Sequence, residues 1–264
     1  MFNKDKELKK ISLSVVIPCY NEEANLKRGV LNQVNDYLKE QKFKWEVLLC
    51  NDESTDNSLQ LLKDFSKKHR NFKVLDLPHG GKPAAVWGGI KEAKHSIVLF
   101  TDMDQSTPIT EFNKFIPYFQ SGSDLVIGSR GATREGNSLI RKIMAAAFLT
   151  GRRLVLLPKI IDTQCGFKAI KTDLAKKIFP ELQFFKDESN KKGWRVSAFD
   201  VELLFMAHKW GYQVNEIPVT WHDEDTSLTK GDMASRYKKE SVQMIKEIIR
   251  IKKNDLKGAY DQEK

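Results

Sequence analysis

Residues 97–104 read Ile-Val-Leu-Phe-Thr-Asp-Met-Asp, an apolar run that ends in two carboxylates separated by one residue. The apolar half of this stretch predicts a buried strand. Asp102 and Asp104 would repel one another unless a cation or a proton lies between them. Hard carboxylate oxygens on a loop suit Mg²⁺ or Mn²⁺ that is also bound by a diphosphate. The position directly after a strand, more than the Asp-x-Asp pair itself, makes this stretch a candidate metal and phosphate site.

Similar β-rich runs recur along the first half of the chain, with helical patterns between them. The runs span residues 13–17, 45–50, 72–75 and 125–127. Residues 21–40 and 58–69 have apolar positions at helical spacing, and each segment follows directly on a strand. This alternation predicts an α/β fold with βαβ units on a mostly parallel sheet. Because ligands of such sheets bind beyond the carboxyl ends of the strands, we expect the chemistry in the segments that follow these runs.

The second half of the chain departs from this alternation. A basic stretch follows residue 128, and after it come an apolar helix-like piece over 139–157 and a helical pattern over 199–209. A chain of this length is commonly a single α/β unit with a short appendage. We divide it into an N-terminal tail, a catalytic domain, a C-terminal amphipathic helix and a final tail. Their bounds are 1–10, 11–228, 229–256 and 257–264.

The chain is basic, with 44 Lys and Arg against 35 Asp and Glu and a formal net charge of +9. Such a balance favours anionic partners such as nucleic acid, acidic lipid or a phosphorylated substrate, without choosing among them. Many lysines alternate with acids on predicted helices, as over 63–68, so a solvated basic surface explains the charge equally well. No recognised nucleic-acid-binding motif is present, and we expect no nucleic-acid partner.

Cysteine use and hydropathy indicate a cytoplasmic protein, soluble or peripheral on a membrane. Cys19, Cys50 and Cys165 are far apart and lack metal-ligand spacing, which is typical of a reducing compartment. No apolar segment follows the charged first ten residues, so no secretory signal is predicted. The longest apolar neighbourhood, 145–157, contains two arginines and is shorter than the ~20 residues of a spanning helix.

Residues 233–251 predict an amphipathic helix. The residues near its apolar face are Met233, Tyr237, Met244, Ile245, Ile248 and Ile251. Lys238, Lys239, Lys246 and Arg250 lie outside that stripe. A basic amphipathic helix can lie on an anionic membrane. Packing on its own domain is the commoner use of such a face, so we expect packing and keep membrane contact as the alternative.

Polar segments follow the first two predicted strands. Residues 18–22 read Pro-Cys-Tyr-Asn-Glu, and residues 51–56 read Asn-Asp-Glu-Ser-Thr-Asp. Their short acceptors could read a ribose hydroxyl or a base N–H. Taken singly, Asn21, Ser54 or Asp56 is better explained as a helix N-cap.

A glycine-rich segment, 79–85, precedes another helical pattern and could cradle phosphate. It is not a P-loop, because no Ser or Thr follows Lys82 and the glycine spacing differs. The dinucleotide fingerprint G-x-G-x-x-G is also missing from the sequence. These departures argue against kinases, GTPases and dehydrogenases.

The order of these motifs resembles the family 2 glycosyltransferases of the GT-A fold. The motifs are Pro-x-Tyr-Asn-Glu at 18–22, Asn-Asp-x-Ser-x-Asp at 51–56, the glycine-rich 80–85, Asp-x-Asp at 102–104 and Gly-Ser-Arg at 128–130. Residues 162–168, Asp-Thr-Gln-Cys-Gly-Phe-Lys, and 199–204, Phe-Asp-Val-Glu-Leu-Leu, look like the dolichyl-phosphate β-glucosyltransferase branch and its prokaryotic relatives. The resemblance covers about residues 11–255. It implies a Rossmann-like, mostly parallel central sheet flanked by helices.

The resemblance also implies an inverting, metal-dependent transfer of a hexose from a nucleotide diphosphate sugar to a polyprenyl or dolichyl phosphate. UDP-glucose is the leading donor. The residues that would line the nucleotide pocket are Pro18, Tyr20, Glu22 and Asp52. Lys82 would approach the nucleotide, while Asp102 and Asp104 would hold Mg²⁺ or Mn²⁺ and the diphosphate.

On the acceptor side, which the second half of the chain would build, the resemblance places Arg130 and Arg141 against the acceptor phosphate, since guanidinium forks match phosphate well. Either arginine could instead pair at the surface with an acid such as Glu135. A polyprenyl phosphate, with a second pKa near ~6, is largely dianionic at neutral pH and needs little help from a base. Asp200 or Glu202 would act as a base only for a hydroxyl acceptor. With a phosphate acceptor we expect both acids to be structural or to orient the arginines and the substrate. Of the two, we include Asp200 among the catalytic residues, with Asp102, Asp104 and Arg130.

The sequence departs from the pattern at two points. Related mannosyltransferases often have a Gln two residues after the second Asp, whereas here Gln105 follows at once and Ser106 takes that place, so the third metal ligand is open. Many relatives carry a membrane span, which this sequence lacks. Membrane contact, at the cytoplasmic face, would come from 139–157, from 233–251 or from a membrane-anchored partner.

Four alternatives remain from the sequence. The first is a transferase of the same fold that extends a glycan through a hydroxyl acceptor. The second is a GDP-mannose-dependent polyprenyl-phosphate mannosyltransferase, and the third is a nucleotidyltransferase that makes a nucleotide sugar. The fourth is a basic nucleic-acid-binding module, which would be indifferent to Asp102 and Asp104 and steeply salt-dependent.

Overall fold

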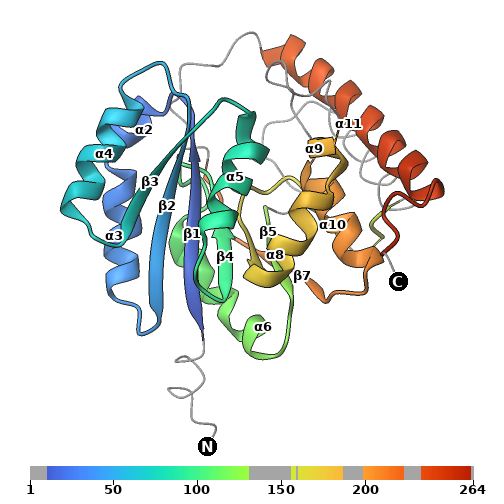
Figure 1. The fold of residues 1–264 in the computed structure, drawn as a ribbon, viewed down its shortest axis with the longest axis horizontal. Coiled ribbons are helices and arrows are strands. Elements are labelled where there is room, and N and C mark those ends of the chain that lie inside the picture. Colours follow the sequence, from blue (N-terminus) through green and yellow to red (C-terminus); the bar gives the residue numbers. More distant parts are fainter. Residues whose placement is uncertain (1–10, 131–155, 159, 187–198, 223–232, 263–264) are drawn as a thin grey trace, which may run out of the picture.

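The computed structural model describes residues 11–130, 156–158, 160–186, 199–222 and 233–262, with only the backbone described for 184 and 233–244. These residues contain a seven-stranded sheet in the order β3-β2-β1-β4-β6-β5-β7 (Figure 1). The strands are β1 Ser12–Cys19, β2 Lys44–Asp52, β3 Phe72–Leu77, β4 Ile97–Phe100, β5 Leu125–Ser129, β6 Lys168–Lys171 and β7 Val214–Pro218. β6 runs antiparallel to β4 and β5, and every other pairing is parallel. The predicted α/β fold with a mostly parallel sheet is confirmed.

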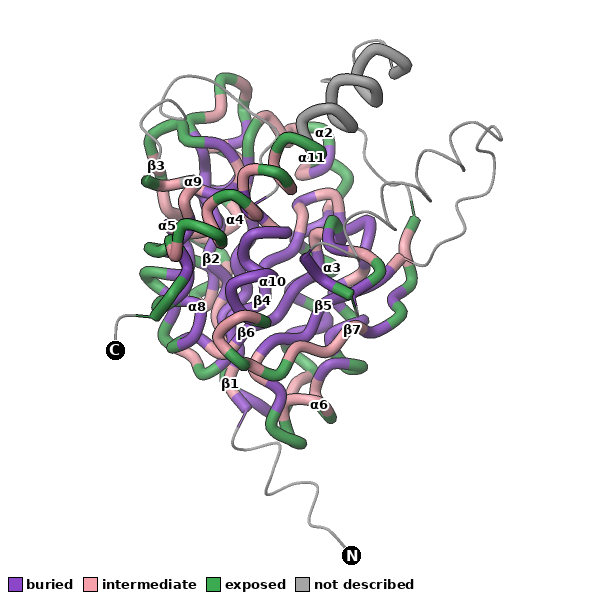
Figure 2. Tube along the Cα trace, turned by 90° about the vertical axis from the view of Figure 1, so that its right-hand side faces the viewer, coloured by how far each residue is buried: buried purple, intermediate pink, exposed green. Residues whose placement is uncertain are grey.

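All five runs predicted as strands form strands, and β1, β4 and β5 are buried along almost their whole length, whereas the edge strand β3 is mostly half-buried or exposed. β4 is buried along its whole length, as Figure 2 shows. β6 and β7 were not predicted from the sequence. β6 is four residues long and has a lysine at each end, and β7 is a half-buried edge strand that ends in a proline. Neither segment has the apolar run that identified the other strands.

Helices cover both faces of the sheet (Figure 1). Elements that pack with the first face are α3 Val30–Lys39, α4 Ser58–Lys68, η1 Ile109–Lys114 and α6 Ile116–Gln120. Elements that pack with the second face are α5 Gly81–Glu92, α8 Thr172–Ile178, η2 Phe179–Glu181, α9 Gln183–Lys186, α10 Phe199–Lys209 and α11 Met233–Leu256. α2, Glu23–Lys27, precedes α3 near the end of β1. The sheet therefore lies between two apolar layers, each with its own core.

The predicted helices form, with one correction. The single helix predicted over 21–40 is two helices, α2 and α3, because Gly29 adopts a φ of 84° directly before α3. A left-handed residue interrupts a right-handed helix, and glycine is the residue that adopts it without strain. The apolar piece 139–157 lies almost entirely outside the described residues, as does Arg141.

The stripe predicted on α11 divides between two surfaces. Ile251 is fully buried and Ile248 packs against the core, whereas Ile245 is half exposed. The predicted packing on the domain is thus confirmed for Ile248 and Ile251 only. The side chains of Met233, Tyr237 and Met244 lie outside the described part of the chain. Within the described residues, none of the helices combines the length and apolar character needed to cross a bilayer.

Helix α5 packs closely on the sheet through glycines. A Cβ added at Gly89 would lie 2.5 Å from Val16 Cγ1 and 2.8 Å from Cys50 Sγ. Val16 and Cys50 are fully buried on neighbouring strands, so neither can move away. A Cβ added at Gly88 would overlap only the end of the Leu77 side chain, which can rotate. Gly89 therefore sets how closely the helix approaches β1 and β2.

We expect Gly89→Ala to lower the free energy of unfolding by about 1–3 kcal/mol relative to Gly88→Ala, because overpacking a rigid core has a cost of that order. The two variants are matched, since each gains the same helix propensity, about 1 kcal/mol. Urea denaturation followed by circular dichroism measures the difference. Equal stability of the two variants would contradict the packing argument.

Candidate active site at the carboxyl ends of the strands

Strained backbone gathers at one edge of the sheet. Asn21, Glu53 and Gln105 have φ values of 55°, 57° and 53° and follow the carboxyl ends of β1, β2 and β4. Non-glycine residues in this left-handed region cost about 1 kcal/mol or more and persist where the surrounding contacts hold them. They mark the edge that the sequence analysis predicted to carry the chemistry.

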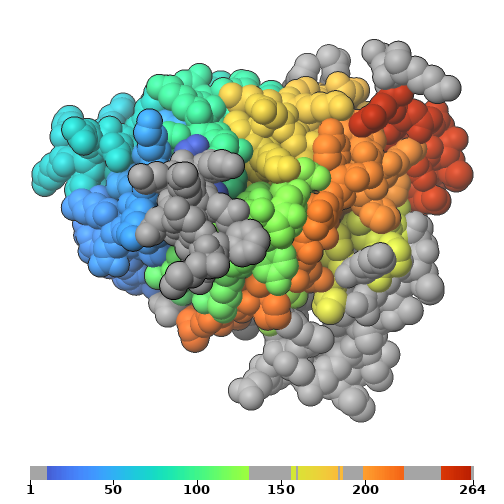
Figure 3. All heavy atoms as spheres, turned by 90° about the horizontal axis from the view of Figure 1, so that it is seen from below, coloured from blue at the N-terminus to red at the C-terminus, as the bar shows by residue number. Residues whose placement is uncertain are grey.

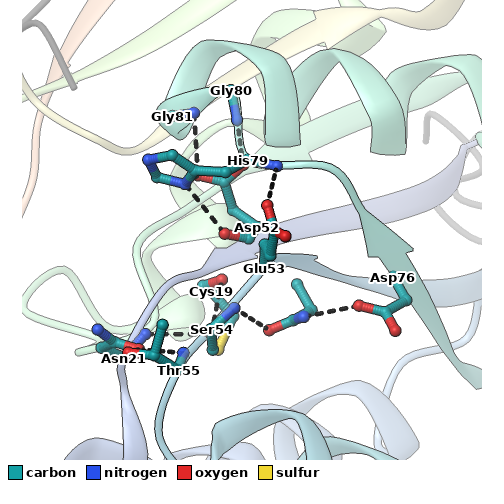
Figure 4. Close-up of polar contacts among 11 residues, drawn as sticks. Cys19, Asn21, Asp52, Glu53, Ser54, Thr55, Asp76, His79, Gly80 and Gly81 are labelled. Atoms are coloured by element: carbon teal, nitrogen blue, oxygen red, sulfur yellow. Dashed lines mark hydrogen bonds and ion pairs between the residues drawn. The ribbon is translucent and has the colours of Figure 1, made fainter. Parts of the chain in front are cut away.

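The segments after β1 and β2 are joined by side-chain to backbone hydrogen bonds. Asn21 Oδ1 accepts a hydrogen bond from the N–H of Thr55 at 2.8 Å (Figure 4). The N–H of Glu22 donates to Ser58 Oγ at 2.8 Å. Asn21 is therefore not the N-cap that we considered more probable, since α2 begins after Glu22 without a side-chain cap. Asp56 does accept from the N–H of Ser58, the first residue of α4, at 2.9 Å. The two polar motifs thus fix each other's loops.

Asp52 holds the start of α5. Its two carboxylate oxygens accept hydrogen bonds from the N–H groups of Gly80 and Gly81 at 2.8 and 2.9 Å, and His79 Nδ1 lies 3.1 Å from the same carboxylate (Figure 4). The side chain is almost fully buried. The ring of Tyr20 lies 4.8 Å from that of His79, between centroids. Three predicted regions, at β1, β2 and the glycine-rich segment, therefore meet around Asp52.

The acidic pair after β4 is tied to two other segments. Asp102 forms a short ion pair with Lys82 of α5. Asp104 Oδ1 accepts from the N–H of Ser106 at 2.8 Å, and Arg28 Nη2 donates to the carbonyl oxygen of Asp104 at 2.6 Å. Arg28 was not singled out in the sequence. Lys82, which we expect to approach the nucleotide, thus contacts the acidic pair through Asp102.

Electrostatics keep Asp102 ionised. Burial opposes ionisation, but the ion pair with Lys82 and the nearby charges of Lys168 and Arg130 outweigh it, so the pKa of Asp102 lies below its ordinary value. Burial likewise opposes the charge on Lys82, and the carboxylates of Asp102, Asp200 and Asp104 outweigh it and raise the pKa of the lysine. Asp102 and Lys82 are therefore both charged, and each stabilises the charge of the other.

Gly166 allows the segment before β6 to approach Asp102. A Cβ at this position would overlap Oδ2 of Asp102. The carboxylate therefore lies directly against the backbone at residue 166. This contact explains in steric terms why the segment 162–168, which the sequence analysis singled out, has a glycine at that point.

Arg130 is held by Asp162. Its Nε and Nη2 atoms donate to the two carboxylate oxygens at 2.7 and 3.0 Å, and its backbone N–H donates to Oδ2 at 3.1 Å. Burial would raise the pKa of Asp162, but the bonds and charge of Arg130 lower it to about 2. The guanidinium carbon lies 5.9 Å from the centre of the Trp221 ring. Arg130 thus follows the end of β5 and is fixed by Asp162, while Glu135 is outside the described residues.

Asp200 pairs with a buried lysine. Lys168 at the start of β6 is fully buried, and its Nζ lies 2.7 Å from Asp200 Oδ1 and 5.8 Å from the centre of the Phe100 ring. Lys168 also donates to the carbonyl oxygen of Cys165. Lys168 was not among the site residues predicted from the sequence. A lysine at the end of a polar segment gives no signal that its side chain is buried.

Glu202 points away from this cluster. It is fully buried, accepts from Tyr260 Oη at 2.7 Å and receives the guanidinium of Arg250 at 2.9 Å. Its contacts join α10 to α11 and to the segment after α11. These contacts give Glu202 a structural role. We predicted that role for the case in which the acceptor is a phosphate.

The donor set fits a divalent cation that a substrate helps to bind. Among the described residues, no group of three His, Cys, Asp or Glu side chains is placed to hold an ion. Asp102 and Asp104 therefore supply two carboxylates without a complete protein cage. Mg²⁺ is commonly bound in this way, by one or two carboxylates together with substrate phosphates. The N–H of His222 donates to the carbonyl oxygen of Ser106 at 2.9 Å, which brings residues 221–222 beside the same loop.

Comparisons with known proteins agree with this arrangement. Residues 14–179 match the family described as glycosyl transferase family 2. The chain is 32% identical to a dolichyl-phosphate β-glucosyltransferase of Dictyostelium discoideum, over 95% of this chain and 76% of that protein. The protein of the same description from Saccharomyces cerevisiae is 31% identical, over 98% of this chain and 79% of its own length. Among solved structures, glucosyl-3-phosphoglycerate synthase from Mycobacterium tuberculosis, in complex with Mn²⁺, UDP and glucosyl-3-phosphoglycerate, superposes with a TM-score of 0.62 at 17% identity, covering 94% of this chain and 82% of that one.

The ion pair of Asp162 with Arg130 predicts a pH dependence of stability. Because the pKa of Asp162 is depressed to about 2 in the folded state, its stabilisation is present above pH ~4 and is lost as the pH falls towards 2. We expect Asp162→Asn to lower the free energy of unfolding by about 2 kcal/mol at pH 7 and the two curves to converge near pH 2. Urea unfolding across this range measures it. As a control, Glu40→Gln at the exposed end of α3 should keep the wild-type profile. A constant offset for Asp162→Asn at every pH would refute the assignment.

Proposed function

The chain belongs to glycosyl transferase family 2, and from this premise we propose that it is a hexosyltransferase that moves glucose from UDP-glucose to a polyprenyl phosphate such as dolichyl phosphate. The observation that carries the proposal is the identity with dolichyl-phosphate β-glucosyltransferases over nearly the whole chain. The solved neighbour supports the GT-A fold. The site supports the proposal independently, because it combines acids for a metal with cations for phosphate.

On the donor side, we assign the nucleotide pocket to Pro18, Tyr20, Glu22 and Asp52. Both oxygens of Asp52 already accept hydrogen bonds from the start of α5, so its contribution is to fix that loop. Tyr20 is among the exposed large apolar side chains and lies beside His79, which leaves its ring available to a ligand. Lys82, at the start of α5, carries the positive charge nearest to Asp102 and would approach the nucleotide.

Asp102 and Asp104 would hold a divalent cation, Mg²⁺ or Mn²⁺, together with the diphosphate. When bound, the ion neutralises charge on the departing nucleoside diphosphate. The ionised state of Asp102 prepares the carboxylate for this role without loss of a proton. Arg28, which donates to the backbone of Asp104, holds the second carboxylate's loop in place.

On the acceptor side, we assign the phosphate contact to Arg130 and to Arg141, which lies outside the described residues. The guanidinium of Arg130 has five N–H donors, and Asp162 accepts hydrogen bonds from two of them. The other donors can bind a second oxyanion. A dianionic phosphate oxygen is itself the nucleophile and requires no base. Asp200, held by buried Lys168, therefore orients the cluster. Direct attack on the anomeric carbon would invert its configuration.

Two alternatives stay within the same fold. GDP-mannose in place of UDP-glucose would use the same acids and arginines. A hydroxyl acceptor on a glycan would need a base, and Asp200 is engaged by a lysine. A polyprenyl acceptor lies in a membrane, so we propose peripheral contact with the cytoplasmic face.

Incubation of the purified protein and a membrane lipid extract with several labelled nucleotide sugars, with and without Mn²⁺ or Mg²⁺, tests the whole assignment, because only the true donor makes the lipid fraction radioactive.

We expect Asp102→Ala or Asp104→Ala to reduce transfer of label at least about a hundredfold, equivalent to ~2.7 kcal/mol of barrier, since each removes a ligand of the ion. Both variants should remain folded by circular dichroism, and Asp102→Ala, which leaves Lys82 without its carboxylate partner, should lower the thermal midpoint more than Asp104→Ala. Asp64→Ala on α4 is the matched control and should retain full activity. Undiminished transfer in the presence of a chelator would refute the metal assignment.

Arg130→Lys should raise the KM for polyprenyl phosphate about tenfold, or ~1.4 kcal/mol, because lysine keeps the charge but loses the planar fork. The dissociation constant for UDP, measured by calorimetry with Mn²⁺, should not change. The wild-type protein titrated in parallel sets the reference for both constants. Equal weakening of both would show that Arg130 acts on the nucleotide or on the fold, and not on the acceptor.

A further inference from the structure

Helix α11 presents an apolar row to solvent. Ile245, Ile249 and Leu256 are 50%, 49% and 77% exposed, and they are three of the five exposed large hydrophobic residues in the described part of the chain. Their spacing of four and seven residues places them on one side of a helix. A row of this kind on a surface marks contact with another apolar body.

The helix is fixed on the opposite side, so this row cannot turn inward. Ile251 is fully buried against the domain. Arg250 of α11 pairs with buried Glu202 of α10 at 2.9 Å, and Asp255 pairs with Lys209 at 2.7 Å. Figure 1 shows α11 along the outer side of α10. The exposed row therefore faces away from the domain.

A basic row runs beside the apolar row. Lys246, Lys253 and Lys257 are exposed and, at about 100° per residue, fall on one line along the helix and the turn that follows it. The acids of this stretch, Glu247 and Asp255, are engaged in ion pairs with Arg250 and with Lys209. The outward face thus combines apolar side chains with uncompensated positive charge.

We propose that this face of α11 docks on the surface of an anionic lipid bilayer. The inference rests on the proposed function in so far as the acceptor is a lipid. An amphipathic helix with apolar residues on one side and lysines at the border binds an anionic membrane in two ways. The apolar side chains enter the lipid, and the lysines are attracted to the anionic headgroups. A second copy of the chain fits less well, because an apolar contact between two copies would make no use of the basic row beside it.

The position of α11 connects this surface with the acceptor side of the site. α10 carries Asp200, which pairs with Lys168 at the strand edge, and two residues later Glu202, which holds Arg250 of α11. A rigid helix thus links the docking face to the cluster that includes Arg130. A protein docked in this way would hold its acceptor cluster in a fixed relation to the membrane.

Sedimentation of the full chain with lipid vesicles tests the proposal without any transfer reaction. We expect binding to vesicles of phosphatidylcholine and phosphatidylglycerol, and at least about tenfold less to phosphatidylcholine alone. Ile245→Gln/Ile249→Gln and Lys246→Glu/Lys253→Glu should each reduce binding at least about tenfold. Lys39→Glu/Lys68→Glu makes the same charge change on α3 and α4, at the opposite end of the molecule, and should bind like the wild type (Figure 3).

Several results would overturn the proposal. They are no binding to anionic vesicles, equal loss in the Lys39→Glu/Lys68→Glu control, or vesicle binding that persists in Ile245→Gln/Ile249→Gln. A dimer that this last variant converts to a monomer, with vesicle binding unchanged, would assign the row to contact between copies. Because all positions are exposed, circular dichroism should show each variant folded. Vesicle binding by a protein that transfers no sugar would support the docking surface and refute only the proposed function.

Discussion

The arrangement of the site depends on the balance of charge around Asp102. Its carboxylate lies against the backbone of Gly166, pairs with Lys82 and is within the field of Lys168 and Arg130. Lys168 and Arg130 are in turn each bound to a further carboxylate, Asp200 and Asp162. A buried cation or anion is tolerated only when it is paired in this way. The edge is thus assembled in charged form before any ligand arrives, and a metal diphosphate would exchange one set of ion pairs for another.

Sheet topology brings these groups together. β6 runs antiparallel between β4 and β5, so its first residue, Lys168, lies at the same edge as the last residues of β4 and β5. The segment before β6 is thereby placed between Asp102 and Arg130. An all-parallel sheet would put the start of that strand at the opposite edge. One reversed strand is therefore what closes the acidic pair against the arginine.

The sequence predicted what depends on local pattern and missed what depends on this pairing. β1 to β5 were found because each has an apolar run, and Asp102 and Asp104 because they follow such a run. β6 has lysines at both ends, and the burial of Lys168 follows only from its neighbours across the sheet. The pairing of Arg130 with Asp162 joins residues from two separate motifs, and a single sequence gives no information on such pairs. Asn21 was expected as a cap because capping is a local rule, whereas its observed partner, Thr55, belongs to the next strand's loop.

The acids of α10 illustrate how the acceptor determines what a site needs. Residues two apart on a helix point to different sides, so Asp200 faces the strand edge and Glu202 faces α11. Asp200 is ion-paired with a buried lysine, and Glu202 is bound to a tyrosine and an arginine. A hydroxyl acceptor would require one of these pairs to break. A phosphate acceptor is already ionised, so both carboxylates can hold the structure in place while the arginines bind the substrate. The fixed engagement of these two acids is thus an independent argument for a phosphorylated acceptor.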